Sequence, residues 1–257
     1  MRKWLIRLGI LLGIILSSLV VLFLAFHEAR PQAKANKQGD LLAQEMLDAL
    51  QASSWDTTRF VRWSFPGDRH YFWDKQNDLV EVHWQKNRVL LHTMSLQAQV
   101  YQNGQSLEGK KATRLKEKAW EMFCNDSFWL CAPYKVFDPG TERALLDLDA
   151  PEKGLLVTFS GGGVNPGDTY LWILDENNIP KAFKMWVKIL PIGGVEARWT
   201  NWKATSTGAI LAQQRQIGTR ISINIENLQT GNDLANFEIE KSPFKDFSLN
   251  LQQESNF

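Results

Sequence analysis

The sequence predicts a mainly β protein, built as a curled antiparallel sheet or incomplete β-barrel capped by two helices and preceded by an N-terminal transmembrane helix. Three observations support this prediction. Residues 57–102 contain short runs with alternating apolar and polar side chains, separated by turn residues. Further runs of the same kind follow at steady spacing from residue 142 to residue 228. Strands and helices do not alternate in the way that is typical of a parallel sheet.

The N-terminal segment has the pattern of a membrane anchor. An uncharged, mostly aliphatic run ends at Phe26 and is preceded by Arg2, Lys3 and Arg7. Such a run is long enough to cross a bilayer, and basic residues ahead of it favour a cytoplasmic N-terminus. We therefore expect residues 1–26 to be a single-pass anchor or uncleaved signal in the cell inner membrane, with the main domain in the periplasm. A long cleavable signal is the alternative.

Residues 27–39 read as a polar linker, residues 40–241 as the main domain and residues 242–257 as a loose C-terminal tail. The domain begins with a helix for which Asp40 is the expected N-cap and in which apolar residues up to Leu50 recur at helical spacing. A second amphipathic helix is expected over residues 110–124.

The expected strands are bounded by turn signals such as Asn103-Gly104 and Asp138-Pro139-Gly140. In chain order they cover residues 57–65, 69–75, 79–85, 88–94, 97–102, 142–148, 154–159, 168–175, 181–189, 195–203, 210–216 and 220–228, with a last edge strand at 237–240.

Composition excludes one class of partner and points to another. The chain has 29 basic and 28 acidic residues, so it lacks the basic surface that nucleic-acid binding requires. Its 11 Trp and 14 Phe are many for a chain of this length. In a β-rich protein they indicate either a strongly aromatic core or an apolar cavity.

The apolar side chains that share strand faces are the candidate ligand-binding residues. A curled sheet with this many large rings is difficult to pack without gaps, so we expect an apolar cavity that binds lipid. A filled core is the alternative. The predicted lining residues are Val61, Trp63, Phe65, Phe72, Val82, Trp84, Trp172, Phe183 and Met185.

The two cysteines, Cys124 and Cys131, lie near the end of the second predicted helix. In an oxidising compartment we expect them to form a disulfide, with two free buried thiols as the alternative.

Neither a metal site nor a cofactor is expected. Strand pairing places His83 and His92 on one face and His70 on the other, and two imidazoles fall short of the usual set of metal ligands. We find no catalytic motif of a hydrolase, metalloprotease or phosphate-binding loop, so no catalytic residue is predicted.

Several short motifs together resemble uncharacterised bacterial envelope proteins related to the outer-membrane lipoprotein-sorting carriers. They are Trp55-x-x-Thr58-Arg59-Phe60, His70-Tyr71-Phe72-Trp73-Asp74, Val100-Tyr101-x-Asn103-Gly104, and Asn125-Asp126-Ser127-x-Trp129-Leu130 followed by Pro133, Lys135 and Asp138-Pro139-Gly140. The resemblance covers roughly residues 40–240 and includes no catalytic signature. It implies an incomplete antiparallel β-barrel, capped by helices, around an apolar cavity that receives acyl chains. The expected anchor departs from the soluble carriers of that group and argues against a shuttling role.

The sequence thus predicts a membrane-anchored extracytoplasmic protein that binds a lipid or an acylated protein and is not an enzyme. The main alternative is a structural or interaction module with a packed aromatic core, which contacts another envelope protein through exposed residues such as Trp129 or Trp202. A weaker alternative is a hydrolase acting on lipid or glycan, which requires a pair of acidic residues inside a cavity.

Overall fold

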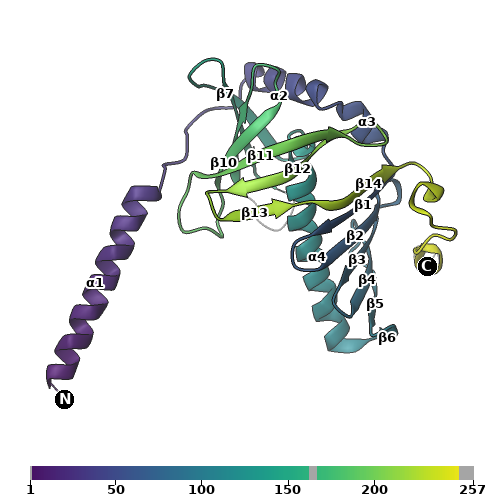
Figure 1. Cartoon of the computed structure of the whole chain (residues 1–257), viewed down its shortest axis with the longest axis horizontal. Coiled ribbons are helices and arrows are strands. Elements are labelled where there is room, and N and C mark those ends of the chain that lie inside the picture. Colours follow the sequence, from purple (N-terminus) through teal and green to yellow (C-terminus); the bar gives the residue numbers. More distant parts are fainter. Residues whose placement is uncertain (1, 162–166, 249–257) are drawn as a thin grey trace.

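The computed structural model describes residues 2–161 and 167–248, and these form two antiparallel sheets of seven strands each (Figure 1). The first sheet has the order β14-β1-β2-β3-β4-β5-β6 and the second the order β13-β12-β11-β10-β9-β8-β7. The predicted mainly β, antiparallel architecture is confirmed, although it consists of two sheets that do not close on each other.

The first sheet contains β1 (Phe60–Phe65), β2 (Arg69–Asp74), β3 (Leu79–Trp84), β4 (Asn87–His92), β5 (Ala98–Gln102), β6 (Gln105–Leu107) and β14 (Glu226–Gly231). The second contains β7 (Thr141–Asp147), β8 (Lys153–Phe159), β9 (Thr169–Leu174), β10 (Pro180–Trp186), β11 (Val195–Ala204), β12 (Ile210–Ile217) and β13 (Ile221–Asn224). The chain passes from the second sheet to the first at Ile225, whose N–H donates to the carbonyl of Gln213 at 2.8 Å.

Helices cover the inner faces of the sheets. Helix α2 (Lys37–Ala49) lies across β7 and β8, and the short α3 (Ala52–Thr57) follows it. Helix α4 (Gly109–Cys131) packs against β4 and β5 and also contacts β12 (Figure 1). Three short 3₁₀ segments complete the described elements: η1 (Lys75–Asn77), η2 (Ala132–Lys135) and η3 (Leu234–Phe237).

The start of α2 and the end of α4 differ from the sequence prediction. The N-cap of α2 is Asn36, whose Oδ1 accepts a hydrogen bond from the N–H of Gly39 at 2.7 Å, whereas the predicted cap Asp40 lies in the first turn. Helix α4 continues past residue 124 to Cys131 because its last turns are covered on several sides. Phe123, Asp126 and Leu130 are all buried there, so the amphipathic pattern ends before the helix does.

Helix α1 (Arg2–Phe26) extends away from the sheets (Figure 1). Several of its described side chains are exposed, including Leu11, Leu12 and Ile14. Among the described residues, no helix combines the length and the apolar composition that crossing a membrane requires, so the predicted transmembrane span is not supported.

The linker after α1 is bound to the second sheet. Glu28 donates its N–H to the carbonyl of Gly193 at 3.0 Å, and its own carbonyl accepts from Trp186 Nε1 at 2.8 Å. Further along, the N–H of Asn36 donates to the carbonyl of Arg143 at 3.0 Å. The linker therefore runs along the sheet and holds the start of α2 against β7.

The segment after β14 covers the outer face of the first sheet. Phe237, Phe244 and Phe247 are buried against Phe60 and Phe72. The predicted edge strand at 237–240 is wrong, because Phe237 ends η3 and the next residue, Glu238, has a left-handed backbone. The part of the predicted tail at residues 249–257 lies outside the described residues.

Candidate functional site

The inner faces of the two sheets carry two clusters of buried apolar side chains, and these clusters contain eight of the nine predicted ligand-binding residues. The first-sheet cluster includes Val61, Trp63, Phe65, Val82 and Trp84, together with Phe123 and Leu130 of α4. The second-sheet cluster includes Trp172, Phe183 and Met185. It also includes Leu42 and Met46 of α2 and Leu50, the C-cap residue of that helix. The half-buried side chains of Trp129 and Tyr134 pack against both clusters and connect them.

Phe72 is the predicted lining residue that lies elsewhere. It faces outward from β2, where its ring stacks on Phe60 with centroids 5.5 Å apart and on Phe244 at 6.0 Å. Its neighbours Tyr71 and Trp73 point inward instead and pack in the first-sheet cluster. Successive residues of a strand face opposite sides of the sheet, so Tyr71 and Trp73 point into the interior while Phe72, between them, points outward.

The first-sheet cluster is built around the fully buried Trp63. Its ring stacks on Tyr71 with centroids 4.5 Å apart and lies 6.4 Å from the rings of both Trp73 and Phe123. Phe123 comes from α4, so this helix packs against the inner face of the first sheet.

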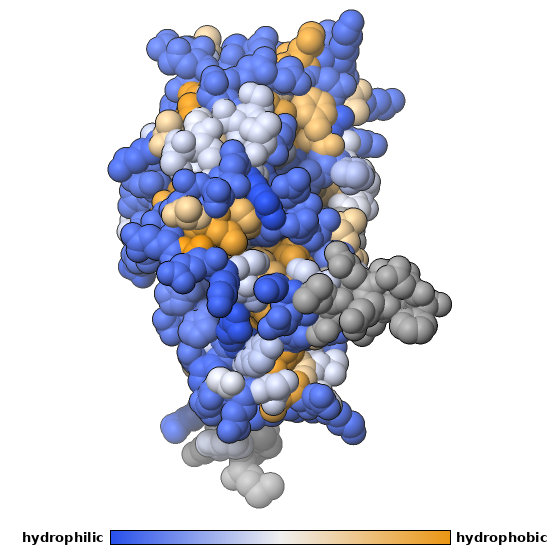
Figure 2. All heavy atoms as spheres, turned by 90° about the vertical axis from the view of Figure 1, so that its right-hand side faces the viewer, coloured by the Kyte–Doolittle hydropathy of each residue, from blue (hydrophilic) through white to orange (hydrophobic). Residues whose placement is uncertain are grey.

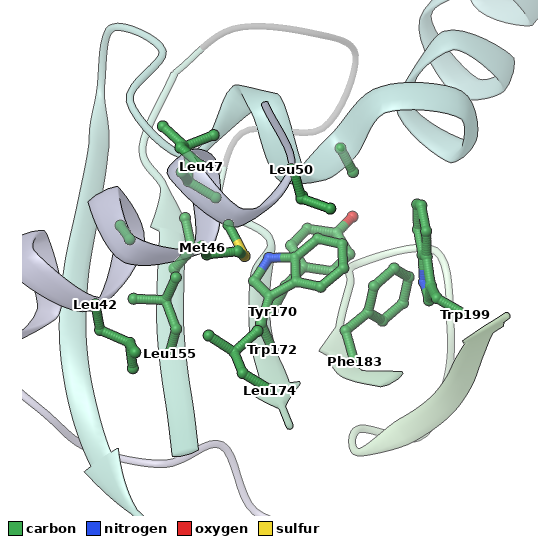
Figure 3. Close-up of a cluster of buried hydrophobic side chains, with 14 of the residues drawn as sticks. Leu42, Met46, Leu47, Leu50, Leu155, Tyr170, Trp172, Leu174, Phe183 and Trp199 are labelled. Atoms are coloured by element: carbon green, nitrogen blue, oxygen red, sulfur yellow. The ribbon is translucent and has the colours of Figure 1, made fainter. Parts of the chain in front are cut away.

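The second-sheet cluster lies beneath α2. The ring of Trp172 meets Phe183 edge to face at 5.0 Å and Trp199 at 5.2 Å. In Figure 3, Met46 and Leu50 of the α2 segment lie directly over the indole of Trp172.

A buried polar contact joins α4 to the first sheet. Asp126 is fully buried and accepts a hydrogen bond from the hydroxyl of Tyr71 at 2.5 Å, while Arg69 Nε lies 3.1 Å from the same carboxylate. Burial raises the pKa of the Asp126 carboxyl, although Tyr71, Asn125 and Arg69 all act in the opposite direction. Burial likewise raises the pKa of Tyr71. The arrangement orients α4 and offers no pair of acidic residues for hydrolysis.

Four buried indole N–H groups in these clusters have no hydrogen-bond acceptor within the described protein. They belong to Trp63, Trp73, Trp172 and Trp199. A buried donor without an acceptor lowers stability, and native proteins contain few of them. The interior therefore presents hydrogen-bond donors among apolar rings, which suits a ligand that is apolar but carries oxygen acceptors.

The two cysteines do not form the predicted disulfide. Both are free thiols, half-buried at Cys124 and buried at Cys131. They lie two turns apart in one continuous helix, about 10 Å along its axis, which exceeds the span of a disulfide. Burial raises the pKa of Cys124 to about 12 and that of Cys131 to about 11, so both stay protonated at neutral pH.

The histidine prediction is partly wrong. His70 pairs directly with His83 across β2 and β3, so these two imidazoles share the outer face, with ring centroids 6.1 Å apart. The described residues contain no group of three or more His, Cys, Asp or Glu side chains placed to hold a metal ion.

A hydrogen-bonded Ser–His–Asp chain at the β1–β2 turn was not found from the sequence. Ser64 Oγ lies 2.9 Å from His70 Nδ1, and His70 Nε2 lies 3.0 Å from Asp68 Oδ1. In serine hydrolases the serine contacts Nε2 and the carboxylate is buried. Here the serine contacts the other nitrogen, Asp68 is exposed, and Ser64 Oγ also accepts from Asn227. These three hydrogen-bonded side chains stabilise the β1–β2 turn, and Ser64 is not positioned as a catalytic nucleophile.

Neither tryptophan proposed as an exposed contact is exposed. Trp129 packs against both inner clusters, and Trp202 is half-buried and donates its Nε1–H to the carbonyl of Pro180 at 2.9 Å. A groove of about 400 Å³ does open between β11, β12 and β14, but polar side chains dominate it: Lys203, Thr205, Ser206, Gln213, Gln229 and Asn236.

The comparisons with known proteins give a likeness of fold. No model of a known protein family matches the sequence, and no curated protein sequence matches it. The chain is similar in structure to a DUF1329 family protein from Desulfovibrio piger, with 12% identity and a TM-score of 0.43 over 80% of this chain and 98% of that one. It is also similar to a putative outer membrane lipoprotein-sorting protein domain from Vibrio parahaemolyticus, with 8% identity and a TM-score of 0.37 over 80% of this chain and 99% of that one. Likenesses at this level carry no argument about function, which has to come from the interior itself.

Proposed function

We propose that this domain binds an acyl chain of a lipid or lipoprotein between the inner faces of its two sheets and the helices that cover them, and that it catalyses no reaction. The observation that carries the proposal is the pair of joined aromatic clusters on those inner faces, covered by α2 and α4 rather than by further strands. The same rings that contact the helices are suited to contact an acyl chain.

A helical cover can be displaced without breaking a sheet. Between its two ends helix α2 satisfies its own backbone hydrogen bonds and meets the second sheet through buried side chains such as Leu42, Met46 and Leu50. The ties outside the helix are at its ends, where Asn36 donates to Arg143 and the carbonyl of Leu50 accepts from the N–H of Ile210. Exposing the four large side chains, which are those of Leu42, Met46, Leu47 and Leu50, costs roughly 6 to 12 kcal/mol. Burying about twelve CH₂ groups of an acyl chain contributes roughly 10 kcal/mol, so the exchange is close to balanced.

The unpaired indole N–H groups also support an acyl ligand. Trp172 and Trp63 each place a donor without an acceptor in the interior. The ester or amide oxygens that link acyl chains to lipids and lipoproteins are acceptors. A ligand of this kind offers partners that a plain hydrocarbon lacks.

The proposed location is the cell envelope, outside the cytoplasm and next to the inner membrane, with α1 associating with that membrane. The exposed apolar side chains of α1, such as Leu11 and Phe26, support this association because neighbouring exposed apolar residues typically mark a surface that contacts a membrane or another protein. Membrane fractionation combined with N-terminal sequencing tests it. Recovery of an intact N-terminus only in the soluble fraction would contradict the proposal.

Tryptophan quenching by a brominated acyl chain tests binding in the interior. We expect a brominated fatty acyl ligand to quench part of the emission of the full-length protein, and Trp172→Phe to reduce the quenched part. Trp186 lies on the other face of the second sheet, where its Nε1 donates to the linker, so Trp186→Phe is the matched control and leaves the quenched part unchanged. Equal quenching in both variants would place the ligand outside the interior.

The close packing of the interior favours a second candidate function, that of an interaction module. Trp63 and Phe183 are fully buried and contact other rings in this structure. On the side shown in Figure 2, hydrophobic residues form separate groups within a mainly hydrophilic surface, and Met94 is 75% exposed. Native mass spectrometry that detects only lipid-free protein, in the presence of phospholipids and acylated peptides, would favour this candidate.

A further inference from the structure

Arg215 is a charged side chain placed in the middle of the interior. It projects from β12 and is fully buried. One terminal nitrogen of its guanidinium donates to the carbonyl of Ala212 at 2.8 Å and the other to the carbonyl of Leu130 at 3.0 Å, and the group lies over the ring of Trp199 at 4.2 Å. Its Nε–H has no acceptor within the described protein.

Among the residues that the structure describes, no carboxylate balances this charge. None of the ion pairs between described residues involves Arg215. The titratable group that acts on it is the Cys131 thiol, which stays neutral at pH 7 because burial raises its pKa to about 11. Burial lowers the pKa of Arg215 to about 9, so the guanidinium still carries its charge at neutral pH. A buried cation without an anion lowers the stability of the fold.

The position of Arg215 joins the two halves of the interior. Trp199, on which the guanidinium stacks, belongs to the second-sheet cluster, and Leu130, whose carbonyl it binds, belongs to the first-sheet cluster. Trp199 also has an indole N–H without an acceptor. The free Nε–H of Arg215 and its positive charge therefore lie next to an acyl chain in either cluster.

We infer that Arg215 receives the carboxylate of a free fatty acid whose chain lies among the inner aromatic rings. This inference rests on the proposed acyl binding and narrows its ligand to an ionised acid. A carboxylate both neutralises the guanidinium and accepts from Nε, whereas an ester of the same length supplies an acceptor without charge. The ligand displaces part of the contact between the end of α4 and β12, since the Leu130 carbonyl is one of the groups now bound to Arg215.

The test compares hexadecanoic acid with methyl hexadecanoate on the full-length protein in a mild detergent, by native mass spectrometry. We expect the acid to bind at least tenfold more tightly than the ester. Arg215→Met should remove this preference while keeping ester binding, which also shows that the variant is folded. Arg215→Lys should keep part of the preference. The matched control is Arg198→Met, because Arg198 on the neighbouring strand is exposed and pairs with Glu196.

Hexadecanoic acid labelled with ¹³C at the carboxyl provides a readout that does not depend on any variant. Bound beside Arg215, its carboxyl should titrate at a lower pH than the same acid in detergent alone. Equal affinity for acid and ester, with no such shift, would overturn the inference and leave acyl binding intact. Failure of both ligands to bind would remove the proposed function together with it.

Discussion

Gly39 of α2 lies in direct contact with the backbone of Ala144 in β7: a Cβ atom on Gly39 would stand 2.6 Å from both the nitrogen and the Cα of Ala144. This contact, together with the Asn36 cap, presses the start of α2 onto the edge strand of the second sheet. The other end of the helix lies over Trp172, and the carbonyl of its C-cap residue Leu50 accepts hydrogen bonds from the N–H of Ile210 at 3.2 Å and from the hydroxyl of Tyr134 at 2.9 Å. Specific contacts therefore hold both ends of α2, and the contact at Gly39 is the tighter of the two because it joins backbone to backbone without room for a Cβ atom.

Replacing Gly39 with alanine overpacks a backbone contact, which costs about 1 to 3 kcal/mol. The higher helix propensity of alanine offsets about 1 kcal/mol of this cost, so we expect a net destabilisation of up to about 2 kcal/mol. Urea unfolding measures the change. Gly161→Ala is the control, since nothing lies within 4 Å of a Cβ at Gly161. Equal midpoints for the two variants would show that the α2 contact is looser than described.

The buried carboxylate of Asp126 should matter more than a surface carboxylate. Asp126→Ala leaves Tyr71 and Arg69 without their partner, and we expect a loss of about 3 kcal/mol in the free energy of unfolding. Asp126→Asn should cost less because it still accepts from Tyr71. Asp138→Ala breaks a pair with Lys135 in which both side chains are 40% exposed, and should cost less than about 1 kcal/mol. Chemical denaturation of the three variants ranks them, and similar losses for Ala at both positions would contradict this account.

The strands were predictable because side chains in a strand point alternately to the two faces of the sheet, and the sequence alternates apolar and polar residues with the same two-residue repeat. Most of the expected strands from Phe60 to Asn224 are present, with ends shifted by a few residues. The register was harder to predict. The β2–β3 connection contains a 3₁₀ turn and a left-handed Asp78, and this turn pairs His70 with His83, so the two side chains share a face instead of lying on opposite faces as predicted. Turn geometry of this kind decides which side chains meet, and composition does not reveal it.

Two parts of the site depend on contacts between distant segments and were not predictable. Phe72 faces outward because Phe244, far along the chain, covers it. Arg215 reads as an ordinary polar residue of an alternating strand, yet it lies on the inner face opposite Trp199 in the adjacent strand. Only the folded arrangement shows that Leu130 of α4 is its neighbour and that, within residues 2–161 and 167–248, it has no acidic partner.

The cysteines should react as two free thiols. After unfolding in denaturant without reductant, alkylation of Cys124 and Cys131 should add two labels to the intact mass. In the native protein labelling should be slow at neutral pH, because burial raises the pKa of both thiols and keeps the reactive thiolate rare. Labelling that appears only after reduction would demonstrate a disulfide and require α4 to be broken between the two residues.

The outer phenylalanine cluster should contribute substantially to stability. Phe244 is 1% exposed and stacks on Phe72, so Phe244→Ala should cost about 3 to 5 kcal/mol. Phe72→Ala should cost a similar amount, and the double variant less than the sum, because the two rings share one contact. Phe137→Ala, at a ring that is 43% exposed, serves as the control. Additive losses for Phe72 and Phe244 would show that the two rings do not depend on each other.

Lys75 should make stability rise with pH in a defined window. Its ammonium donates to the carbonyl of Trp55 and lies over the Trp55 ring at 3.8 Å, and burial lowers its pKa to about 8. Between about pH 8 and pH 10.5, the usual pKa of a lysine, Lys75 is therefore protonated in a larger fraction of the unfolded molecules than of the folded molecules. The free energy of unfolding should rise across this window, by at most about 1.4 kcal/mol per pH unit for one proton.

Lys75→Met should remove this rise, so that the difference in stability between variant and wild type changes steadily from pH 8 to pH 9.5. Burial raises the pKa of Cys124 and of Tyr134, and their loss of stability at higher pH is the same in both proteins and cancels in the difference. Cys131 interacts with Lys75, but its pKa of about 11 keeps it protonated in the folded protein up to pH 9.5. Lys181→Met is the control, because the contact with Glu152 raises the pKa of Lys181 and keeps it charged throughout the window. A difference that stays constant with pH for Lys75→Met would show that this lysine titrates at its ordinary value and that its contact with Trp55 is open to water.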